Sequence, residues 1–295
     1  MNTSSLLALV IIHLFVQNGS CAYFPPIDAT WQKQAETVVG SDKIGSPQGI
    51  FIDRDNTLYI ADVYNYRIVK LEYGSTNVSV VLDGLDYPTD LVIDKKGTMF
   101  VAEKESLTRW PKGFHNRTIL ARAEWLLSVA IDPRQEHLYI TDYFSNYVKK
   151  YIANGEAEQN GTVVVPNAIS PWSVAINGID TVFAASYYGS VREWKRNESG
   201  EGKVVIDQLG EPRGISLDCF GTLYIANCGG NSVVRVLAGS KTATVIAAGN
   251  GIGDAPDQLY NPADAAFDSY GNLYVSDYGN GRVQRFRINQ KTLSQ

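Results

Sequence analysis

Short apolar runs alternate with polar turns along most of the chain, and runs of the same kind return six times in the same order. In each repeat a first apolar run ends in an acid or Asn, and a polar turn leads into a second run rich in β-branched and aromatic residues. A third run alternates polar and apolar positions. Such composition favours β-strands, and alternation is typical of a strand with one buried face. The pattern predicts three strands per repeat, named a, b and c in chain order.

The repeats return with the period of a β-propeller blade, which is about 40–45 residues. The residues that end strand a mark this period, and they are Asp53, Asp94, Asp132, Asn177, Asp218 and Asp268. Repeats one to five continue into a fourth apolar run, which predicts an outer strand d. The predicted blades lie near residues 46–82, 87–121, 126–166, 170–207, 211–248 and 261–288, the last with 35–39.

The sixth repeat lacks an outer run of its own. The segment AETVVGSDKIG, which starts at Ala35, precedes the first repeat and resembles the outer run that starts at Thr244. Pairing of Ala35–Val39 with Arg282–Ile288 would complete the last blade and close the ring, which leaves only short strand edges. We therefore predict an all-β, six-bladed propeller of four-stranded antiparallel blades, closed by its N-terminal strand.

The N-terminus has the pattern of an export signal. Leu6–Val16 is apolar but too short to cross a bilayer, and small residues follow it up to Ala22. We interpret residues 1–22 as a signal peptide and residues 23–295 as one secreted, extracellular domain without membrane insertion. The alternative interpretation of the apolar run is a buried strand at the start of the fold.

The repeat residues resemble those of the NHL family. Pro and Gly open strand a, Asp ends it, LYIAD or a close variant forms strand b, and Asn and Arg lead into strand c, as in IADVYNYRIVKL and VSDYGNGRVQRF. The resemblance covers roughly residues 44–288, although the second repeat lacks the Asn-Arg element and the fourth has Asn177 and Ser186 where acids are usual. It implies a propeller that serves as a binding platform, while the fold alone does not fix an activity.

Charge and cysteine content exclude several classes of function. The formal net charge is −5 with no cluster of Lys and Arg, which argues against nucleic acid as a partner. A zinc-binding Cys/His cluster of the kind found in ubiquitin ligases is also missing from the sequence. Cys219 and Cys228 stand at opposite ends of the predicted strand b of repeat five, about 20 Å apart at ~3.3 Å per residue. A disulfide between them is therefore not expected.

Two kinds of propeller enzyme offer an alternative function. The peptidyl-α-hydroxyglycine lyases, which this chain resembles in export and fold, use a zinc ion held by several His, but only His115 and His137 follow the predicted signal peptide. Lactonase-type propellers place acids and Asn around a divalent ion in the channel. Asp90 and Asp264, near the start of strand a, are candidates to bind Ca²⁺ or another divalent ion. We expect a hydrated channel without a resident cofactor, and the sequence points to no catalytic residue.

The loops between strands b and c hold the candidate binding residues. Aromatic rings gather there, and loops on a rigid scaffold are where binding groups concentrate. The predicted partner-binding residues are Tyr64, Asp90, Tyr143, Phe144, Tyr187, Tyr188, Asp264 and Tyr278. The two acids favour a partner with a basic or cationic group. The predicted function is a monomeric extracellular module that binds a protein, peptide or small ligand.

Four glycosylation sequons have equivalent positions in the repeats. Each lies between the predicted strands c and d of the first four blades, which places all of them on the side of the propeller away from the b–c loops. The acceptor residues are Asn77, Asn116, Asn160 and Asn197.

Overall fold

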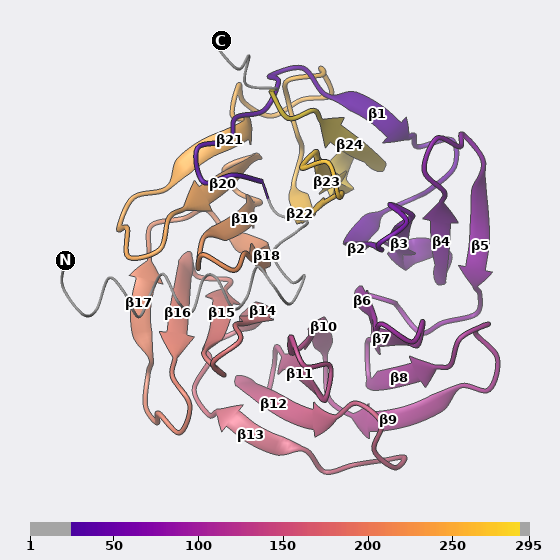
Figure 1. Ribbon diagram of the computed structural model, residues 1–295, viewed down its shortest axis with the longest axis vertical. Helices are drawn as coiled ribbons and strands as arrows, with labels where there is room; N and C mark the ends of the chain where they lie inside the picture. Colours follow the sequence, from indigo (N-terminus) through magenta and orange to yellow (C-terminus); the bar gives the residue numbers. More distant parts are fainter. Residues whose placement is uncertain (1–24, 290–295) are drawn as a thin grey trace, which may run out of the picture.

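Each repeat folds into one blade, and six blades surround a central channel (Figure 1). The computed structural model describes residues 25–289, so the predicted signal peptide lies outside the described residues. The first three blades contain β2 (Pro47–Ile52), β3 (Leu58–Asp62), β4 (Arg67–Leu71) and β5 (Val78–Leu82); β6 (Asp90–Ile93), β7 (Met99–Glu103), β8 (Ser106–Trp110) and β9 (Thr118–Arg122); and β10 (Leu126–Ile131), β11 (His137–Asp142), β12 (Tyr147–Ile152) and β13 (Thr162–Val165).

The other three blades follow the same order of strands. They contain β14 (Pro171–Ile176), β15 (Val182–Ser186), β16 (Ser190–Trp194) and β17 (Lys203–Ile206); β18 (Pro212–Leu217), β19 (Leu223–Asn227), β20 (Ser232–Val236) and β21 (Thr244–Ala248); and β22 (Pro262–Phe267), β23 (Leu273–Asp277), β24 (Arg282–Phe286) and β1 (Glu36–Val39). The predicted fold class is confirmed, including the four antiparallel strands of each blade.

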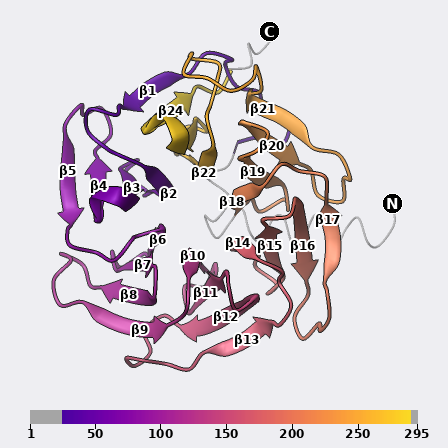
Figure 2. The ribbon, with the colours of Figure 1, turned by 180° about the vertical axis from the view of Figure 1, so that it is seen from behind.

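The N-terminal strand closes the ring as predicted. β1 lies beside β24 in both face views (Figures 1 and 2), and the two strands pair antiparallel with Glu36 opposite Arg285 and Val39 opposite Val283. The Glu36 carboxylate accepts hydrogen bonds from Arg285 and from Arg287. Because the last three strands come from the C-terminal end of the described chain, this blade joins its two ends.

The core of the protein lies between the blades. Strand b of the first blade, β3, is buried at every position, and its alternate side chains pack against the two neighbouring blades. Among the described residues, six clusters of buried apolar side chains occur, one at each blade–blade interface. This burial on both faces explains why strand b is a continuous apolar run in the sequence.

The acid that ends strand a has the same structural role in every blade. In the first blade, one carboxylate oxygen of Asp53 accepts hydrogen bonds from the backbone N–H groups of Asp55 and Thr57 and holds the a–b turn. Asn177 does the same with its amide oxygen for Ile179 and Thr181. Asn can therefore replace Asp in the fourth blade without loss of the turn.

The Asp and Arg of the NHL-like element form a buried ion pair. Asp62, at the end of β3, is fully buried and accepts hydrogen bonds from Arg67 Nε at 2.9 Å and from the amide of Asn65. Asp277 and Arg282 repeat this pair at 2.6 Å in the last blade. In the second blade, which lacks the element, Glu103 pairs instead with Arg117 at 2.9 Å. The motif residues thus hold the b–c loops in place.

Candidate functional site

The innermost strands leave one edge unpaired, and it faces the channel. Near the start of each of these strands stands one residue of a ring that we call the girdle: Gly49, Asp90, Ser128, Ser173, Gly214 and Asp264. Side chains of the girdle accept hydrogen bonds from the inward N–H groups of neighbouring blades. For example, Asp264 Oδ2 accepts from Ile50 N at 3.0 Å, and Asp90 Oδ2 accepts from Val129 N at 2.9 Å. An exposed strand edge is thereby capped from within.

The two glycines of the girdle explain why each of its two acids accepts two hydrogen bonds. Gly49 and Gly214 have no side chain to cap the N–H of the next blade, so Asp90 Oδ1 and Asp264 Oδ1 each bend back to accept from the residue that follows them, at 2.8 Å. The absence of a side chain also gives the acids their space, because a Cβ on Gly214 would lie 2.1 Å from Asp264 Oδ1. Each acid therefore caps two N–H groups.

Burial raises the pKa of both girdle acids, Asp90 and Asp264. Burial raises the pKa of Asp90 to about 6, although the N–H groups that it accepts act in the opposite direction. Burial, followed by the charge of Asp90, raises the pKa of Asp264 well above its usual range. All four carboxylate oxygens accept backbone N–H groups. The contacts of Asp90 and Asp264 thus show a capping role, and within residues 25–289 they belong to no group of three potential metal ligands.

The girdle divides the channel into two compartments. On the side of the a–b turns the channel holds a cavity of about 380 Å³, which is lined mainly by apolar residues of the innermost strands, with Asp53 and Arg54 among the lining. At the girdle itself the free volume falls to about 20 Å³, which is roughly the room for one water molecule. The girdle is therefore the narrow part of the channel.

The opposite end of the channel, which we call the b–c face, carries a continuous band of aromatic side chains. We call this band the aromatic belt. Neighbouring ring centroids lie 5.3–6.5 Å apart around the belt, within the range of favourable ring contacts. It consists of Tyr64, Tyr87, Trp125, Tyr143, Phe144, Trp172, Tyr187, Tyr188 and Tyr278.

One arginine closes the belt. The Arg213 guanidinium carbon lies 4.7 Å from the centre of the Trp172 ring and 5.6 Å from that of Tyr278, so it bridges the gap between the fourth and sixth blades. On the far side of this gap, the hydroxyl of Tyr278 donates to that of Tyr64 at 3.2 Å. Tyr64, Phe144 and Tyr188 are the most exposed rings of the belt, with 51%, 59% and 73% of their surface accessible.

The structure groups most of the residues that the sequence predicted for this face. All six predicted aromatic residues belong to the belt, whereas Asp90 and Asp264 lie in the girdle below it. Sequence reasoning missed four members of the site because they lie outside the b–c loops, just before or at the start of an innermost strand. These are Tyr87, Trp125, Trp172 and Arg213. Alignment of the positions before strand a across the repeats could have found them.

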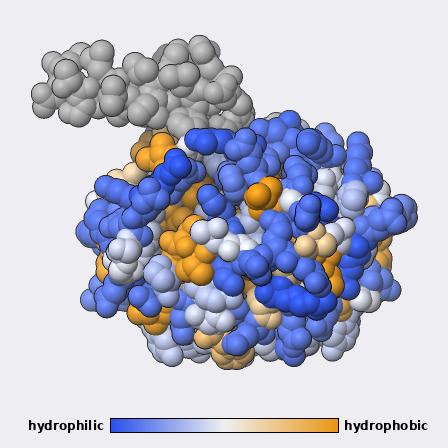
Figure 3. Space-filling view, turned by 90° about the horizontal axis from the view of Figure 1, so that it is seen from below, coloured by the Kyte–Doolittle hydropathy of each residue, from blue (hydrophilic) through white to orange (hydrophobic). Residues whose placement is uncertain are grey.

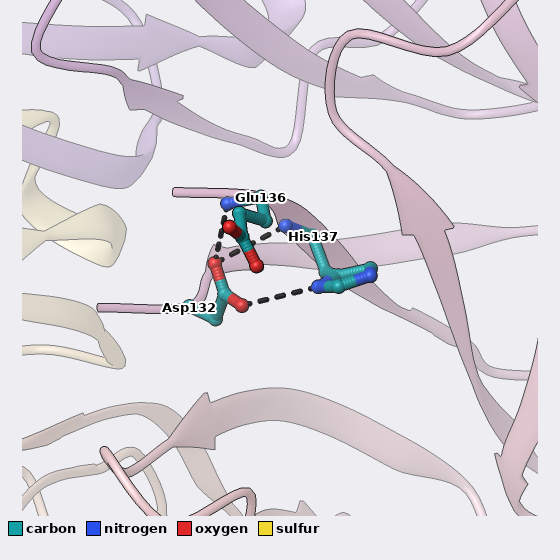
Figure 4. A group of neighbouring side chains, drawn as sticks. All are labelled: Asp132, Glu136 and His137. Atoms are coloured by element: carbon teal, nitrogen blue, oxygen red, sulfur yellow. Dashed lines mark hydrogen bonds and ion pairs between the residues drawn. The ribbon is translucent and has the colours of Figure 1, made fainter. Parts of the chain in front are cut away.

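A second group of ionisable side chains lies on the side of the a–b turns. Asp132, Glu136 and His137 are close enough to hold an ion (Figure 4). However, Asp132 Oδ1 accepts the backbone N–H groups of Glu136 and His137 and so holds an a–b turn that is one residue longer than that of the first blade. Its Oδ2 lies 3.2 Å from His137 Nδ1. The acid is therefore part of the a–b turn. His115 lies in another hairpin, between β8 and β9.

The four sequons lie in the outer hairpins of the first four blades. Asn77, Asn116, Asn160 and Asn197 are exposed, and each lies between strand c and strand d as expected. These hairpins reach the circumference of the disc, where Glu158 N donates to Ile119 O of the preceding blade. The edge of the disc is mainly hydrophilic, with separate apolar spots (Figure 3). The sequons thus lie in the outer hairpins of four consecutive blades.

Two smaller expectations can also be compared with the structure. Cys228 is a free, buried thiol, so the Cys219–Cys228 bond is absent, as predicted. Within residues 25–289, no helix has the length and apolar character needed to span a bilayer.

Comparisons with known proteins agree with this architecture. A family model described as the NHL repeat matches residues 259–286, which include the strands β22–β24. Among curated protein sequences, no relative matches the chain. Similar solved structures include an auxiliary nutrient binding protein from Bacteroides thetaiotaomicron, with 11% identity, a TM-score of 0.69, and coverage of 91% of this chain and 75% of that one.

Two further structures illustrate how widely this fold is used. A streptogramin B lyase has 11% identity and a TM-score of 0.61, over 86% of this chain and 97% of that one. A chain of a nidogen/laminin complex has 16% identity and a TM-score of 0.58, over 65% of this chain and 75% of that one. At such identities the likeness concerns the fold alone. The chain thus has the six-bladed β-propeller fold, and its last blade matches the NHL repeat.

Proposed function

We propose that this protein is a secreted binding module, which takes up an extracellular protein, peptide or small ligand on the aromatic belt of its b–c face. The observation that carries the proposal is the band of neighbouring rings at one mouth of the channel, which Arg213 completes and in which three rings are more than half exposed. Aromatic side chains bring a large rigid contact area at a small cost in conformational entropy, and they are enriched at binding hot spots.

The chemistry of the channel favours binding over catalysis. A lyase or lactonase that depends on a channel ion would need several free donor atoms at one point. In the girdle, the oxygens of Asp90 and Asp264 already accept N–H groups, and Ser128 and Ser173 act as acceptors for the neighbouring blades. The belt, in contrast, offers surfaces that no other part of the described chain covers.

Removal of exposed rings should weaken binding without unfolding the protein. We expect the triple variant Tyr64→Ala, Phe144→Ala, Tyr188→Ala to lose at least ~tenfold in affinity for partners that the wild-type protein captures from extracellular fluid, because hot-spot rings dominate interface energies. Affinities would be measured with purified partner by surface plasmon resonance.

A matched control comes from the opposite side of the molecule. Tyr73 and Tyr270 contact each other there and are equally exposed, at 52% and 59%. The double variant Tyr73→Ala, Tyr270→Ala should bind as the wild type does. Loss of binding in this control variant, with the triple variant unaffected, would place the binding surface on the side of the a–b turns.

Secretion is proposed together with glycan attachment. When a eukaryotic secretory host produces the protein, Asn77, Asn116, Asn160 and Asn197 should carry glycans, because all four are exposed in hairpins. Partial digestion with an N-glycosidase should lower the apparent mass in up to four steps on a denaturing gel. The variant with all four changed to Gln should migrate as the digested protein does. An undigested secreted protein of the same mass as this variant would contradict the proposal.

A further inference from the structure

Three arginines in the described chain have a buried Nε without a hydrogen-bond partner, and Arg213 is the one whose Nη groups donate no hydrogen bond either. Arg235 donates through Nη1 to Ala29 O, and Arg285 donates through Nη2 to Glu36. Arg67, Arg117 and Arg282 each pair with a buried acid. Arg213 has no ion pair within the part of the chain that the structure describes, and its Nε is buried without a hydrogen-bond partner. A buried donor without a partner costs stability, and more so when it is charged. Such a group calls for an explanation beyond the fold.

Aromatic rings hold the Arg213 guanidinium in place, and it forms no ion pair with an acid of the described chain. Trp172 and Tyr278 flank it, and both belong to the belt. The nearest acid along the strand, Glu211, hydrogen bonds to the hydroxyl of Tyr187 and approaches the Cys228 thiol at 4.0 Å. The positive charge is therefore held in one place between aromatic rings at the mouth of the channel, while its terminal Nη groups make no hydrogen bond in the described structure.

This arrangement suits a ligand that combines negative charge with a flat apolar group. A guanidinium binds a carboxylate through two parallel hydrogen bonds, which are stronger than neutral ones. The adjoining rings of Trp172, Tyr187 and Tyr143 offer contact area for the apolar part of the same ligand. We infer that Arg213 anchors the carboxylate of an aromatic carboxylic acid on the b–c face. The inference rests on the proposed function, since it names the ligand class of the same surface.

The inferred ligand reverses the charge that the sequence led us to expect. The expectation of a cationic partner depended on Asp90 and Asp264 at the centre of the b–c face. Those acids lie in the girdle with their oxygens occupied. The charges beside the belt are Arg213 at Trp172, Lys104 at Trp125, and Glu211, which hydrogen bonds to Tyr187.

Benzoate is a suitable probe because it has both features and little else. Binding would be followed by NMR, through the indole N–H signal of Trp172, which the variant Trp172→Phe would assign. We expect benzoate to shift this signal saturably, while benzamide and benzylammonium bind at least ~tenfold more weakly because they lack the carboxylate. Arg213→Gln should weaken benzoate binding by at least ~tenfold, and Arg213→Lys should restore part of it, since Lys keeps the charge but not the paired donors.

A second arginine provides the control for where benzoate binds. Arg54 lines the cavity on the other side of the girdle, so Arg54→Gln should leave benzoate binding unchanged. Loss of binding in Arg54→Gln, or equal binding by Arg213→Gln and wild type, would overturn the inference. N-acetylphenylalanine and its amide would separate two sources of the same chemistry: preference for the acid shows that a peptide C-terminus fits, and binding of benzoate alone limits the site to small free acids.

The test separates the inference from the proposed function. If benzoate binding depends on Arg213 while the triple belt variant still captures its partners normally, the anchor is real and the proposed docking surface is wrong. If the triple variant loses its partners while benzoate never shifts the Trp172 signal, the docking surface stands and the carboxylate inference fails.

Discussion

Deletion of residues 23–43 should make the propeller aggregate and should lower its melting temperature strongly. The deletion removes β1, so β24 is left with an unpaired edge along Arg282–Phe286. It also removes Val39, which is fully buried, and Trp31, which is 5% exposed and packs in the interface between the last two blades. Loss of a buried Trp alone costs about 3–5 kcal/mol, a large part of the stability of a typical protein. Open edges invite pairing with other chains.

A shorter deletion provides the control for this experiment. Removal of residues 23–28 keeps Trp31 and β1, so that protein should remain monomeric and melt close to the full chain. Light scattering after gel filtration and thermal unfolding by circular dichroism would check both variants. A monomeric protein with an unchanged melting temperature after the longer deletion would mean that β1 is dispensable for the ring.

A single methyl group in the girdle should be almost as damaging. In Gly214→Ala the new Cβ would lie 2.1 Å from Asp264 Oδ1 and 2.7 Å from its Cα, and the latter belongs to the backbone and cannot rotate away. We expect the free energy of unfolding to fall by about 3 kcal/mol, as for a severe overpacking change. The melting temperature should then fall by roughly 6–12 °C in a protein of this size.

Gly84→Ala is the matched control for Gly214→Ala. A Cβ at Gly84 would meet no atom within 4 Å, but its φ of +67° is unfavourable for Ala. This variant should lose only about 1 kcal/mol. Equal losses in the two variants, measured by urea denaturation, would show that the contact with Asp264 is not responsible.

The fold could be predicted from the sequence because each of the six repeats contains the same pattern of strand and turn residues. The apolar runs, the turn acids such as Asp53 and the Asp62–Arg67 element recur in phase, and each corresponds to a contact within its own blade. Closure of the ring was also predictable. The last repeat lacks an outer run, and the outer run near Ala35 belongs to no repeat, so the two can be paired.

The site could be predicted only in part because its members come from different blades. Loop residues such as Tyr64 and Phe144 are placed by the b–c connection alone, so their position beside other rings could be read from one repeat. The depth of Asp90 depends on which backbone N–H groups of the next blade face the channel, and no single repeat contains that information. Arg213 looks in the sequence like an ordinary strand residue, because its lack of an ion pair is a property of the assembled ring.

The closing pair of strands also determines when the protein can finish folding. During translation β1 is synthesised before all the other strands and β24 after them. The pairing of Glu36 with Arg285 therefore cannot form until the whole chain between them has been made. During synthesis, each of the earlier blades can complete its own four strands as soon as its repeat emerges, whereas the last blade depends on the most sequence-distant contact in the described fold. Contacts of large sequence separation slow folding. A defect near residue 282 would therefore become apparent only after five blades had already formed.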